Sequence, residues 1–420
     1  MKRLTFMLRV CQKKDFLTNG NIEKGTIVVA RIILLISRSL YLSKTLSFCR
    51  FNYNKGLLMK QLLMPILFLV LHLFSVVSCD KGISNADVGP NRLEKKVLKI
   101  AKQHNIPSIA LQVKTGDAVL NVNYTHPDVK EQKIFGIGST TKFLSATLIL
   151  KLIEEGKLKL EGNAQDYVED LAVVEKGDTI KIENLLNHTS GLSDYTMSPE
   201  WRETVVDGNG PKDFKTKFGY IDNELKNHGM YSYSNTNYLL LQKVVETVLS
   251  KSYDTAFNDF FESNGLEGIR LDDAESDLQA FYAENDKGSA DVSGWKENYG
   301  YDGGAYSEPE ALNMFLQKLF VEKLLVNEKT IALMASWIST DSMTIPIGEG
   351  NISEYGNGIM KLNYNGKEYL GHAGGTLKYQ SFMFHDPKDG VSVSVVTNCS
   401  GKYYNTVFFQ EIIPTILDAL

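Results

Sequence analysis

One apolar segment in the middle of the chain constrains its fold more than any other feature of the sequence. It follows Gly136-Ile137-Gly138-Ser139-Thr140-Thr141-Lys142 and carries its apolar side chains at helical spacing over residues 143–153. This spacing predicts a buried amphipathic helix that begins near Ser139. Ser139 and Lys142 are three residues apart, so a helix places them on one face. A hydroxyl beside an amine can act as a nucleophile and its base when burial or nearby cations suppress the charge of the lysine.

The Ser-x-x-Lys pair is short, and the chain contains a second copy of it. Ser293-Gly294-Trp295-Lys296 lies in a polar stretch interrupted by a glycine, whereas the first copy opens a long apolar helix. The N–H groups at the start of such a helix can hold an anion. We therefore expect Ser139 and Lys142 to be the functional pair.

The N-terminal part of the chain predicts export. Met59-Lys60 precedes an apolar run over residues 62–71 and the ending Val76-Val77-Ser78-Cys79, which together are typical of a secretory signal peptide. The ending resembles the lipobox of bacterial lipoproteins, which implies cleavage before Cys79 and attachment of a lipid to it. A plain signal peptide with an incidental cysteine is the alternative. Residues 80–91 are polar and are expected to form a tether.

Residues 1–58 contain no convincing globular unit, and we interpret them as an extension read from an incorrectly chosen start codon. A membrane segment around residues 27–42 is the alternative. Arg31 and Arg38 oppose it, because a charge at the centre of a bilayer is costly. The sequence after Cys79 contains no apolar run long enough to span a membrane.

The composition after Cys79 excludes several functions. Residues 1–79 hold 12 of the 45 basic and 2 of the 50 acidic residues, so 33 basic and 48 acidic side chains remain, a net charge of −15. So acidic a protein is a poor candidate for binding nucleic-acid phosphates. Cys399 is the last cysteine left, which excludes an internal disulfide. No histidine or cysteine cluster has metal-ligand spacing, and neither a metal nor an organic cofactor is expected.

Strand patterns at both ends of the sequence predict the fold class. Alternating apolar and polar residues flank Thr115-Gly116-Asp117, and a second pair of strand-like segments flanks Asp386-Pro387-Lys388-Asp389-Gly390, so each predicts a β-hairpin. We expect an α+β (mixed α/β) fold: an antiparallel sheet flanked by N- and C-terminal helices, with an inserted, mostly helical lobe. The predicted strands span residues 108–113, 118–123, 380–385 and 391–397, and the flanking helices span 93–104 and 407–417.

Two polar stretches in the middle of the chain are candidates for function. Tyr233 and Asn235 stand where a turn leads into a helix; a tyrosine can pass protons, and an asparagine can orient both a lysine and a substrate amide. For His188, beside a turn, we favour bonding of loop backbone groups over proton transfer. Residues 199–230 are polar and rich in glycine, and we interpret them as a mobile excursion over the rim of a cleft. The scattered histidines His104, His126, His228 and His385 are expected to be surface or capping residues.

Three motifs stand in order along the chain: Ser139-x-x-Lys142, Tyr233-x-Asn235, and His372-Ala373-Gly374 after a strand. Asn187-His188-Thr189-Ser190-Gly191-Leu192 lies between the first two. The set resembles the serine β-lactamase and penicillin-binding family, most closely the branch of class C β-lactamases, D-alanyl-D-alanine carboxypeptidases, D-aminopeptidases and related esterases. The resemblance covers residues 92–417. We expect a β-lactamase/transpeptidase-like domain over 92–420, with a sheet lobe (92–135 and 300–420) and a helical lobe (136–299).

The resemblance implies a role for each site residue. Ser139 would be the nucleophile that forms the acyl-enzyme. Lys142 and Tyr233 would be its general bases, and Tyr233 would also protonate the leaving group. Asn235 would orient Lys142 and the substrate amide. The N–H groups of Ser139 and Gly375 would form the oxyanion hole.

The last motif departs from the family pattern of Lys-Thr-Gly or His-Thr-Gly. Ala373 removes the hydroxyl that would bind a substrate carboxylate. His372, which would contact the substrate opposite the serine, leaves the site only partly cationic near neutral pH. An absent donor to a charged group costs about 1.5–3 kcal/mol. A peptidase or carboxypeptidase for D-amino-acid derivatives, or an esterase, is therefore favoured over an efficient β-lactamase.

The expected partners follow from these assignments. They are a small-molecule or peptide substrate (peptidoglycan-like, an ester or a lactam) and the membrane of the bacterial cell envelope, reached through the lipid on Cys79. Nucleic acid is not expected. A non-catalytic protein that binds penicillin or cell-wall fragments is the alternative, but a binder does not need the activated hydroxyl that Ser139, Lys142 and Tyr233 provide.

Overall fold

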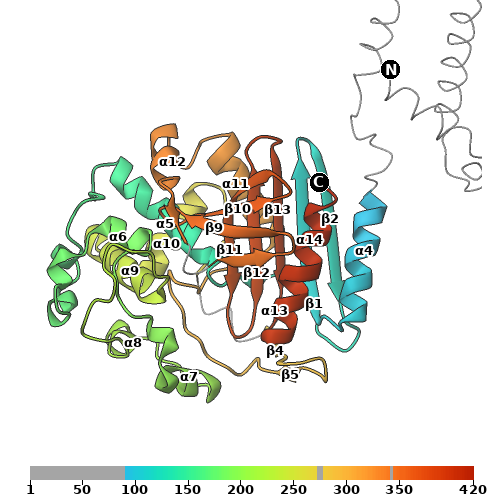
Figure 1. Cartoon of the computed structure of the whole chain (residues 1–420), viewed down its shortest axis with the longest axis horizontal. Coiled ribbons are helices and arrows are strands. Elements are labelled where there is room, and N and C mark those ends of the chain that lie inside the picture. Colours follow the sequence, from blue (N-terminus) through green and yellow to red (C-terminus); the bar gives the residue numbers. More distant parts are fainter. Residues whose placement is uncertain (1–89, 272–277, 341–343) are drawn as a thin grey trace, which may run out of the picture. The chain divides into compact units, whose positions relative to one another are not determined.

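The computed structural model of the chain describes residues 90–271, 278–340 and 344–420 (Figure 1). The described residues belong to one compact unit. The extension over 1–58, the signal peptide over 59–79 with Cys79, and the tether up to residue 89 lie outside the described residues and stay predictions, as do the lobe boundaries. No helix within the described ranges is long and apolar enough to cross a bilayer.

One antiparallel sheet of nine strands runs through the described part of the chain (Figure 1). Its strands are β1 (Ser108–Thr115), β2 (Ala118–Thr125), β7 (Ile338–Ser339), β8 (Ile345–Ile347), β9 (Gly350–Tyr355), β10 (Met360–Tyr364), β11 (Lys367–Gly375), β12 (Gln380–Asp386) and β13 (Val391–Thr397). They lie in the order β2-β1-β13-β12-β11-β10-β9-β7, with β8 paired to β9. Ile109 of β1 lies opposite Thr397 of β13. The predicted antiparallel sheet built from both ends of the chain is confirmed.

Helices cover both faces of this sheet (Figure 1). α4 (Pro90–Gln103), α13 (Lys402–Val407) and α14 (Ile413–Leu417) pack on one face with the helical turn Phe408–Ile412, and α5 (Thr140–Glu154) and α11 (Pro309–Leu316) pack on the other. Val393 and Val395 point into the first layer and Val396 into the second, as the two-residue period of a strand requires. β13 is buried along its whole length for this reason.

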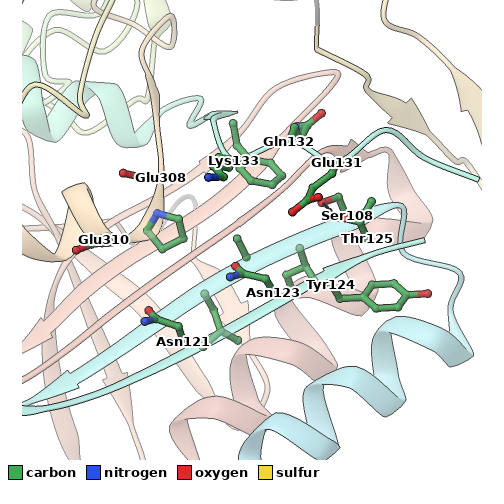
Figure 2. Close-up of a pocket in the computed structure, with 15 residues that line it drawn as sticks. Ser108, Asn121, Asn123, Tyr124, Thr125, Glu131, Gln132, Lys133, Glu308 and Glu310 are labelled. Carbon is green, nitrogen blue, oxygen red and sulfur yellow. Dashed lines mark hydrogen bonds between the residues drawn. The ribbon is translucent and has the colours of Figure 1, made fainter. Parts of the chain in front are cut away.

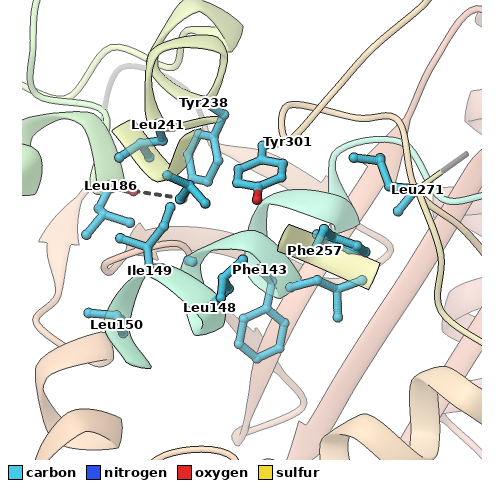
Figure 3. Close-up of a cluster of buried hydrophobic side chains, with 14 of the residues drawn as sticks. Phe143, Leu148, Ile149, Leu150, Leu186, Tyr238, Leu241, Phe257, Leu271 and Tyr301 are labelled. Atoms are coloured by element: carbon cyan, nitrogen blue, oxygen red, sulfur yellow. Dashed lines mark hydrogen bonds between the residues drawn. The ribbon is translucent and has the colours of Figure 1, made fainter. Parts of the chain in front are cut away.

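Helix α5 is more deeply buried than its sequence predicts. The helix is confirmed, but its side chains are buried on all sides from Thr140 to Leu150. It lies between the sheet and the helices α9 (Asn235–Leu249), α10 (Tyr253–Ser263) and α12 (Glu328–Met334). Figure 3 shows Phe143 and Ile149 packed among aromatic and aliphatic side chains that include Tyr238 and Leu241 of α9, Phe257 of α10, and Tyr301. A helix enclosed in this way needs no polar face.

Residues 199–230 contain helices that the sequence analysis did not predict. α7 (Pro199–Val206) and α8 (Phe214–Phe218) begin at Ser198 and Asp213, whose side chains accept N–H groups of the first turn. Trp201 of α7 packs in a small core with Leu239 of α9. The buried ammonium of Lys217 in α8 donates to Asn298 O. The region is therefore anchored to the rest of the unit by both apolar and polar contacts.

The remaining elements are short. β3 (Phe135–Gly136) pairs with β6 (Tyr306–Ser307) and leads into the turn before α5. β4 (Phe281–Tyr282) pairs with β5 (Ala290–Asp291) and with β14 (Cys399–Ser400). Helix α6 (Ile182–Leu186) packs on α9. Single helical turns span Ala164–Asp166, Glu169–Val173, Gly177–Thr179, Tyr195–Met197 and Gln317–Val321.

Candidate active site

A glycine turn places Ser139 at the start of α5. Gly138 has a φ of 51°, and a Cβ on it would lie 2.9 Å from Gly375 N. Glycine alone combines this left-handed conformation with so close an approach of two backbones. The turn therefore rests against the end of β11, and the backbone of Ser139 lies beside that of Gly375.

The backbone amides of the first turn of α5 are largely occupied. The N–H groups of Thr140, Thr141 and Lys142 donate to carbonyl oxygens three residues earlier, at 3.2, 2.9 and 2.9 Å. The expectation that this helix start holds an anion on free N–H groups is wrong for these three, because the tight turn satisfies them. No acceptor for the Ser139 N–H is recorded among the described residues, so this group can serve as an oxyanion donor.

The side chain of Lys142 is fully buried and faces three acceptors. Its Nζ lies 3.0 Å from Ser139 Oγ and 2.6 Å from Asn235 Oδ1, and it also donates to Asp302 O. An ammonium has three protons, so this set accounts for all of them. Burial lowers the pKa of Lys142 to about 8, although the carboxylates of Asp302 and Asp194 oppose part of the decrease.

The amide of Asn235 is fixed by a carboxylate behind it. Its Nδ2 donates to Asp194 Oδ2 at 2.8 Å and to Thr196 Oγ1 at 3.1 Å. A carboxylate can only accept, so Nδ2 faces Asp194 and Oδ1 must face Lys142. The structure thus brings Asn235 to the lysine as predicted. Both Nδ2 protons are used within the protein, and a contact of Asn235 with a substrate amide stays a prediction.

Asp302 contributes its backbone rather than its side chain to the lysine. Its carboxylate is held by the Tyr195 hydroxyl at 2.5 Å and by the Gly300 N–H at 2.8 Å, which aims the carbonyl oxygen at Lys142. Neither Asp194 nor Asp302 was predicted from the sequence. No motif marks them, because Asp194 acts on Lys142 through the Asn235 amide and Asp302 through a backbone carbonyl.

The aromatic ring of Tyr233 also lies close to the lysine. Lys142 Nζ is 5.0 Å from the centre of its ring. Burial raises the pKa of Tyr233 well above its ordinary value, while an interaction with the Ser139 hydroxyl opposes part of the increase. Tyr233 Oη is buried and has no hydrogen bond of full geometry among the described residues. The Ser139 hydroxyl is therefore the polar side-chain group that interacts with this phenol.

His372 is buried behind the site, with both ring nitrogens occupied. Nδ1 lies 2.6 Å from Ala373 O and Nε2 lies 3.0 Å from Tyr355 Oη. A carbonyl can only accept, so Nδ1 carries the proton and Nε2 accepts from the tyrosine. Burial, followed by the charge of Lys142, lowers the pKa of His372 to about 3. It is neutral at pH 7 rather than partly cationic as expected, and its contact with substrate stays a prediction.

The second Ser-x-x-Lys copy is part of a loop. The Ser293 hydroxyl donates to Asp291 Oδ1 at 2.5 Å and accepts the Ala280 N–H at 3.0 Å, which accounts for it structurally. Within the described residues, no group of three histidine, cysteine or acidic side chains could hold a metal ion.

A cavity of about 220 Å³ opens elsewhere, at the β1–β2 edge of the sheet (Figure 2). Ser139, Lys142, Tyr233 and Asn235 do not line it. The polar side chains labelled there include Asn121 and Asn123 of β2, Glu131 and Lys133 of the segment before β3, and Glu308 and Glu310 at the start of α11. The cavity is therefore separate from the cluster around the serine.

A family model described as beta-lactamase matches residues 91–406. Protein flp of Staphylococcus aureus (strain MRSA252) is 26% identical over 327 residues, which make up 72% of this chain and 62% of that protein. The chain thus spans less than two thirds of the length of this relative.

Solved structures share the fold. A D-amino acid amidase from Ochrobactrum anthropi SV3, complexed with L-phenylalanine amide, superposes with a TM-score of 0.65 and 20% identity over 79% of this chain and 98% of the amidase. The octameric penicillin-binding protein homologue from Pyrococcus abyssi superposes with a TM-score of 0.62 and 22% identity, over 78% of this chain and 77% of the homologue.

Proposed function

Because the chain belongs to the beta-lactamase family, we propose that it is a serine hydrolase that cleaves an amide, ester or lactam bond through an acyl-enzyme on Ser139. One observation carries the proposal: a fully buried lysine amine lies 3.0 Å from the Ser139 hydroxyl. A hydroxyl and a base within hydrogen-bond range, with the base oriented by further groups, is the arrangement of an activated nucleophile.

Lys142 is the better base of the two candidates. With a pKa of about 8, roughly one lysine in ten is uncharged at pH 7. Asn235 Oδ1 and Asp302 O can only accept, so they retain the two N–H groups of the neutral amine. The lone pair then points at Ser139 Oγ and takes its proton as the oxygen attacks the substrate carbonyl.

Tyr233 is suited to the acid step. Its raised pKa keeps the phenol protonated, so it can donate a proton to the leaving nitrogen or oxygen, and the Lys142 ammonium can return a proton to the phenolate. The N–H groups of Ser139 and Gly375 face the developing oxyanion in this proposal. Each such donor typically contributes about 2.7–4 kcal/mol to the chemical step. Water then hydrolyses the acyl-enzyme.

D-amino-acid amides, peptides or esters are the favoured substrates. The likeness to a D-amino acid amidase supports this class. The end of β11 supports it too, since Ala373 has no hydroxyl and the neutral His372 offers no positive charge to a substrate carboxylate. Parallel hydrolysis assays on D-phenylalanine amide, p-nitrophenyl acetate, a D-Ala-D-Ala peptide and nitrocefin test the choice, with the lowest rate expected for nitrocefin.

Labelling by a fluorophosphonate and by a fluorescent penicillin tests the nucleophile. We expect the wild type and Ser293→Ala, the matched control at the second Ser-x-x-Lys copy, to be labelled, and Ser139→Ala to be unlabelled. Full labelling of Ser139→Ala would remove this serine from the mechanism. Stoichiometric labelling of the wild type without turnover of any substrate would favour the non-catalytic binder instead.

We also propose that the protein is exported and anchored through a lipid on Cys79. The signal-peptide pattern before Cys79 and the acidic chain after it support this proposal. Cys399 is an unsuitable alternative, because it is buried and burial raises its thiol pKa to about 12. Metabolic labelling with a fatty-acid probe and detergent phase partitioning should show a lipidated protein for the wild type and Cys399→Ala, and none for Cys79→Ala. Equal lipidation of all three would contradict the assignment.

A further inference from the structure

The imidazole of His188 holds the backbone on both sides of Tyr233. His188 follows α6 in a left-handed conformation with a φ of 59° and is fully buried. Its carbonyl oxygen accepts the Ser232 N–H at 2.8 Å, and its Nδ1 accepts the Ser234 N–H at 3.2 Å. One residue therefore fixes the position before Tyr233 and the position after it.

The same ring packs against the Tyr233 side chain. Their centroids are 4.2 Å apart, and their planes are tilted by 31°. Tyr238 and Tyr355 surround the imidazole at 5.5 and 4.9 Å. This packing restricts the orientation of the Tyr233 phenol, because a ring in a filled aromatic cluster has little room to change rotamer.

A neighbouring asparagine fixes the protonation state of the imidazole. Asn237 Nδ2 lies 3.0 Å from His188 Nδ1, and Asn237 Oδ1 accepts from Ser190 Oγ at 2.6 Å, so the amide presents its donor to the ring. Nδ1 thus receives two N–H groups and carries no proton. Burial, and then the charge of Lys142, lowers the pKa of His188 well below its ordinary value. A neutral ring of this kind is a fixed acceptor.

We propose that His188 is a positioning residue, which holds the Tyr233 phenol and the start of α9 in place beside Ser139 and Lys142. The proposal rests on the proposed hydrolase function. Without the Nδ1 acceptor, the Ser234 N–H and the Asn237 amide lose a buried partner, and the backbone that carries Tyr233 and Asn235 is free to shift.

His188→Phe tests the acceptor and His188→Asn tests the ring. Phenylalanine retains an aromatic ring without an acceptor, and asparagine retains an acceptor near the Nδ1 position without the ring. The measurement is a time course of fluorophosphonate labelling. Its amplitude reports the folded fraction, whereas its rate constant reports the geometry of the molecules that are folded.

We expect the rate constant of His188→Phe to fall about 10-fold or more, since a displacement of about 1 Å at a reacting centre can cost about 100-fold in rate. His188→Asn should fall less. His385→Asn is the matched control: His385 is also buried, and its Nδ1 bonds Ser392 Oγ at 3.0 Å outside the site. This control can lose amplitude but should keep the wild-type rate constant.

The outcomes distinguish a failure of the proposed hydrolase function from a failure of the positioning role of His188. An unlabelled wild type would overturn the hydrolase function itself. A labelled wild type with an unchanged rate constant in His188→Phe, or in His188→Asn if the first variant does not fold, would overturn the positioning role alone.

Discussion

At the scale of single residues, the three acceptors around Lys142 decide the chemistry. Ser139 Oγ can both give and accept a proton, whereas Asn235 Oδ1 and Asp302 O can only accept. Among these three groups, Lys142 can therefore exchange a proton only with Ser139 Oγ. Its own burial provides the neutral form that this exchange requires.

The rate of acylation should depend on pH in one direction. In the proposed mechanism Lys142 can act as a base only when it is neutral, so the acylation rate constant should rise as the pH increases toward about 8 and level off above it. Labelling with an uncharged fluorophosphonate between pH 5 and pH 10 measures this profile. Substitution of Lys142 by Met should remove the pH-dependent part. A wild-type profile that is flat or falls between pH 6 and pH 8 would contradict the assignment.

The site residues that belong to sequence motifs could be predicted. The residues that act on Lys142 indirectly, through another side chain or through the backbone, could not. Ser139, Lys142, Tyr233 and Asn235 do lie together. Asp302 could not be found by pattern, because it meets Lys142 through a carbonyl oxygen that every residue type carries. The neutral state of His372 could not be predicted either, since it results from burial and from the nearby charge of Lys142.

At the scale of elements, the contact between β11 and the turn before α5 sets the geometry of the site. A Cβ on Gly374 would lie 2.2 Å from Ile137 O and 2.9 Å from Thr140 N, whereas a Cβ on the next residue, Gly375, would point into open space. The strand can approach the helix this closely only because Gly374 has no side chain.

This contact predicts that substitutions at two adjacent glycines have different effects on stability. Gly374→Ala should destabilise the protein by about 2 kcal/mol or more, because backbone atoms rather than flexible side chains must move. Gly375→Ala should fold with nearly wild-type stability and serves as the control. Thermal unfolding measures both, with a decrease of about 3 °C or more expected for Gly374→Ala. Equal melting temperatures for the two variants would show that the contact is less tight than described.

Element prediction succeeded where a pattern was long and failed where elements were short. The hairpin of β1 and β2 and the apolar helix α5 were found from their periodicity. Helices α7 and α8 were missed because they span only 8 and 5 residues and are stabilised by their caps and by contacts such as Trp201 with Leu239. Local sequence carries little information about helices that depend on distant partners.

At the scale of the whole molecule, the buried histidines make the stability of the folded state depend on pH. Burial lowers the pKa of His372 to about 3 and that of His385 to about 4, and lowers that of His188 well below its ordinary value. His385 was expected at the surface, but it stacks on Phe320 in the interior. The folded state therefore excludes protons that the unfolded chain binds below about pH 6.5.

Stability should fall as the pH is lowered through this range. The unfolded chain binds more protons than the folded one between about pH 6.5 and pH 3, so the free energy of unfolding should decrease by up to about 1.4 kcal/mol per pH unit for each such histidine. Urea unfolding at several pH values measures the slope. His385→Asn should reduce it. A slope equal to that of the wild type in this variant would exclude the buried ring as a source.

The pairing of β1 with β13 joins residues 109–115 to residues 391–397. During synthesis, the nucleophile therefore leaves the ribosome long before the strand that completes its surroundings. A partly translated chain has Ser139 and Lys142 but lacks the strand that carries Gly375. Hydrolytic activity should therefore appear only after the last strands have left the ribosome and paired in the sheet. A chain whose synthesis stops before residue 391 should therefore be inert.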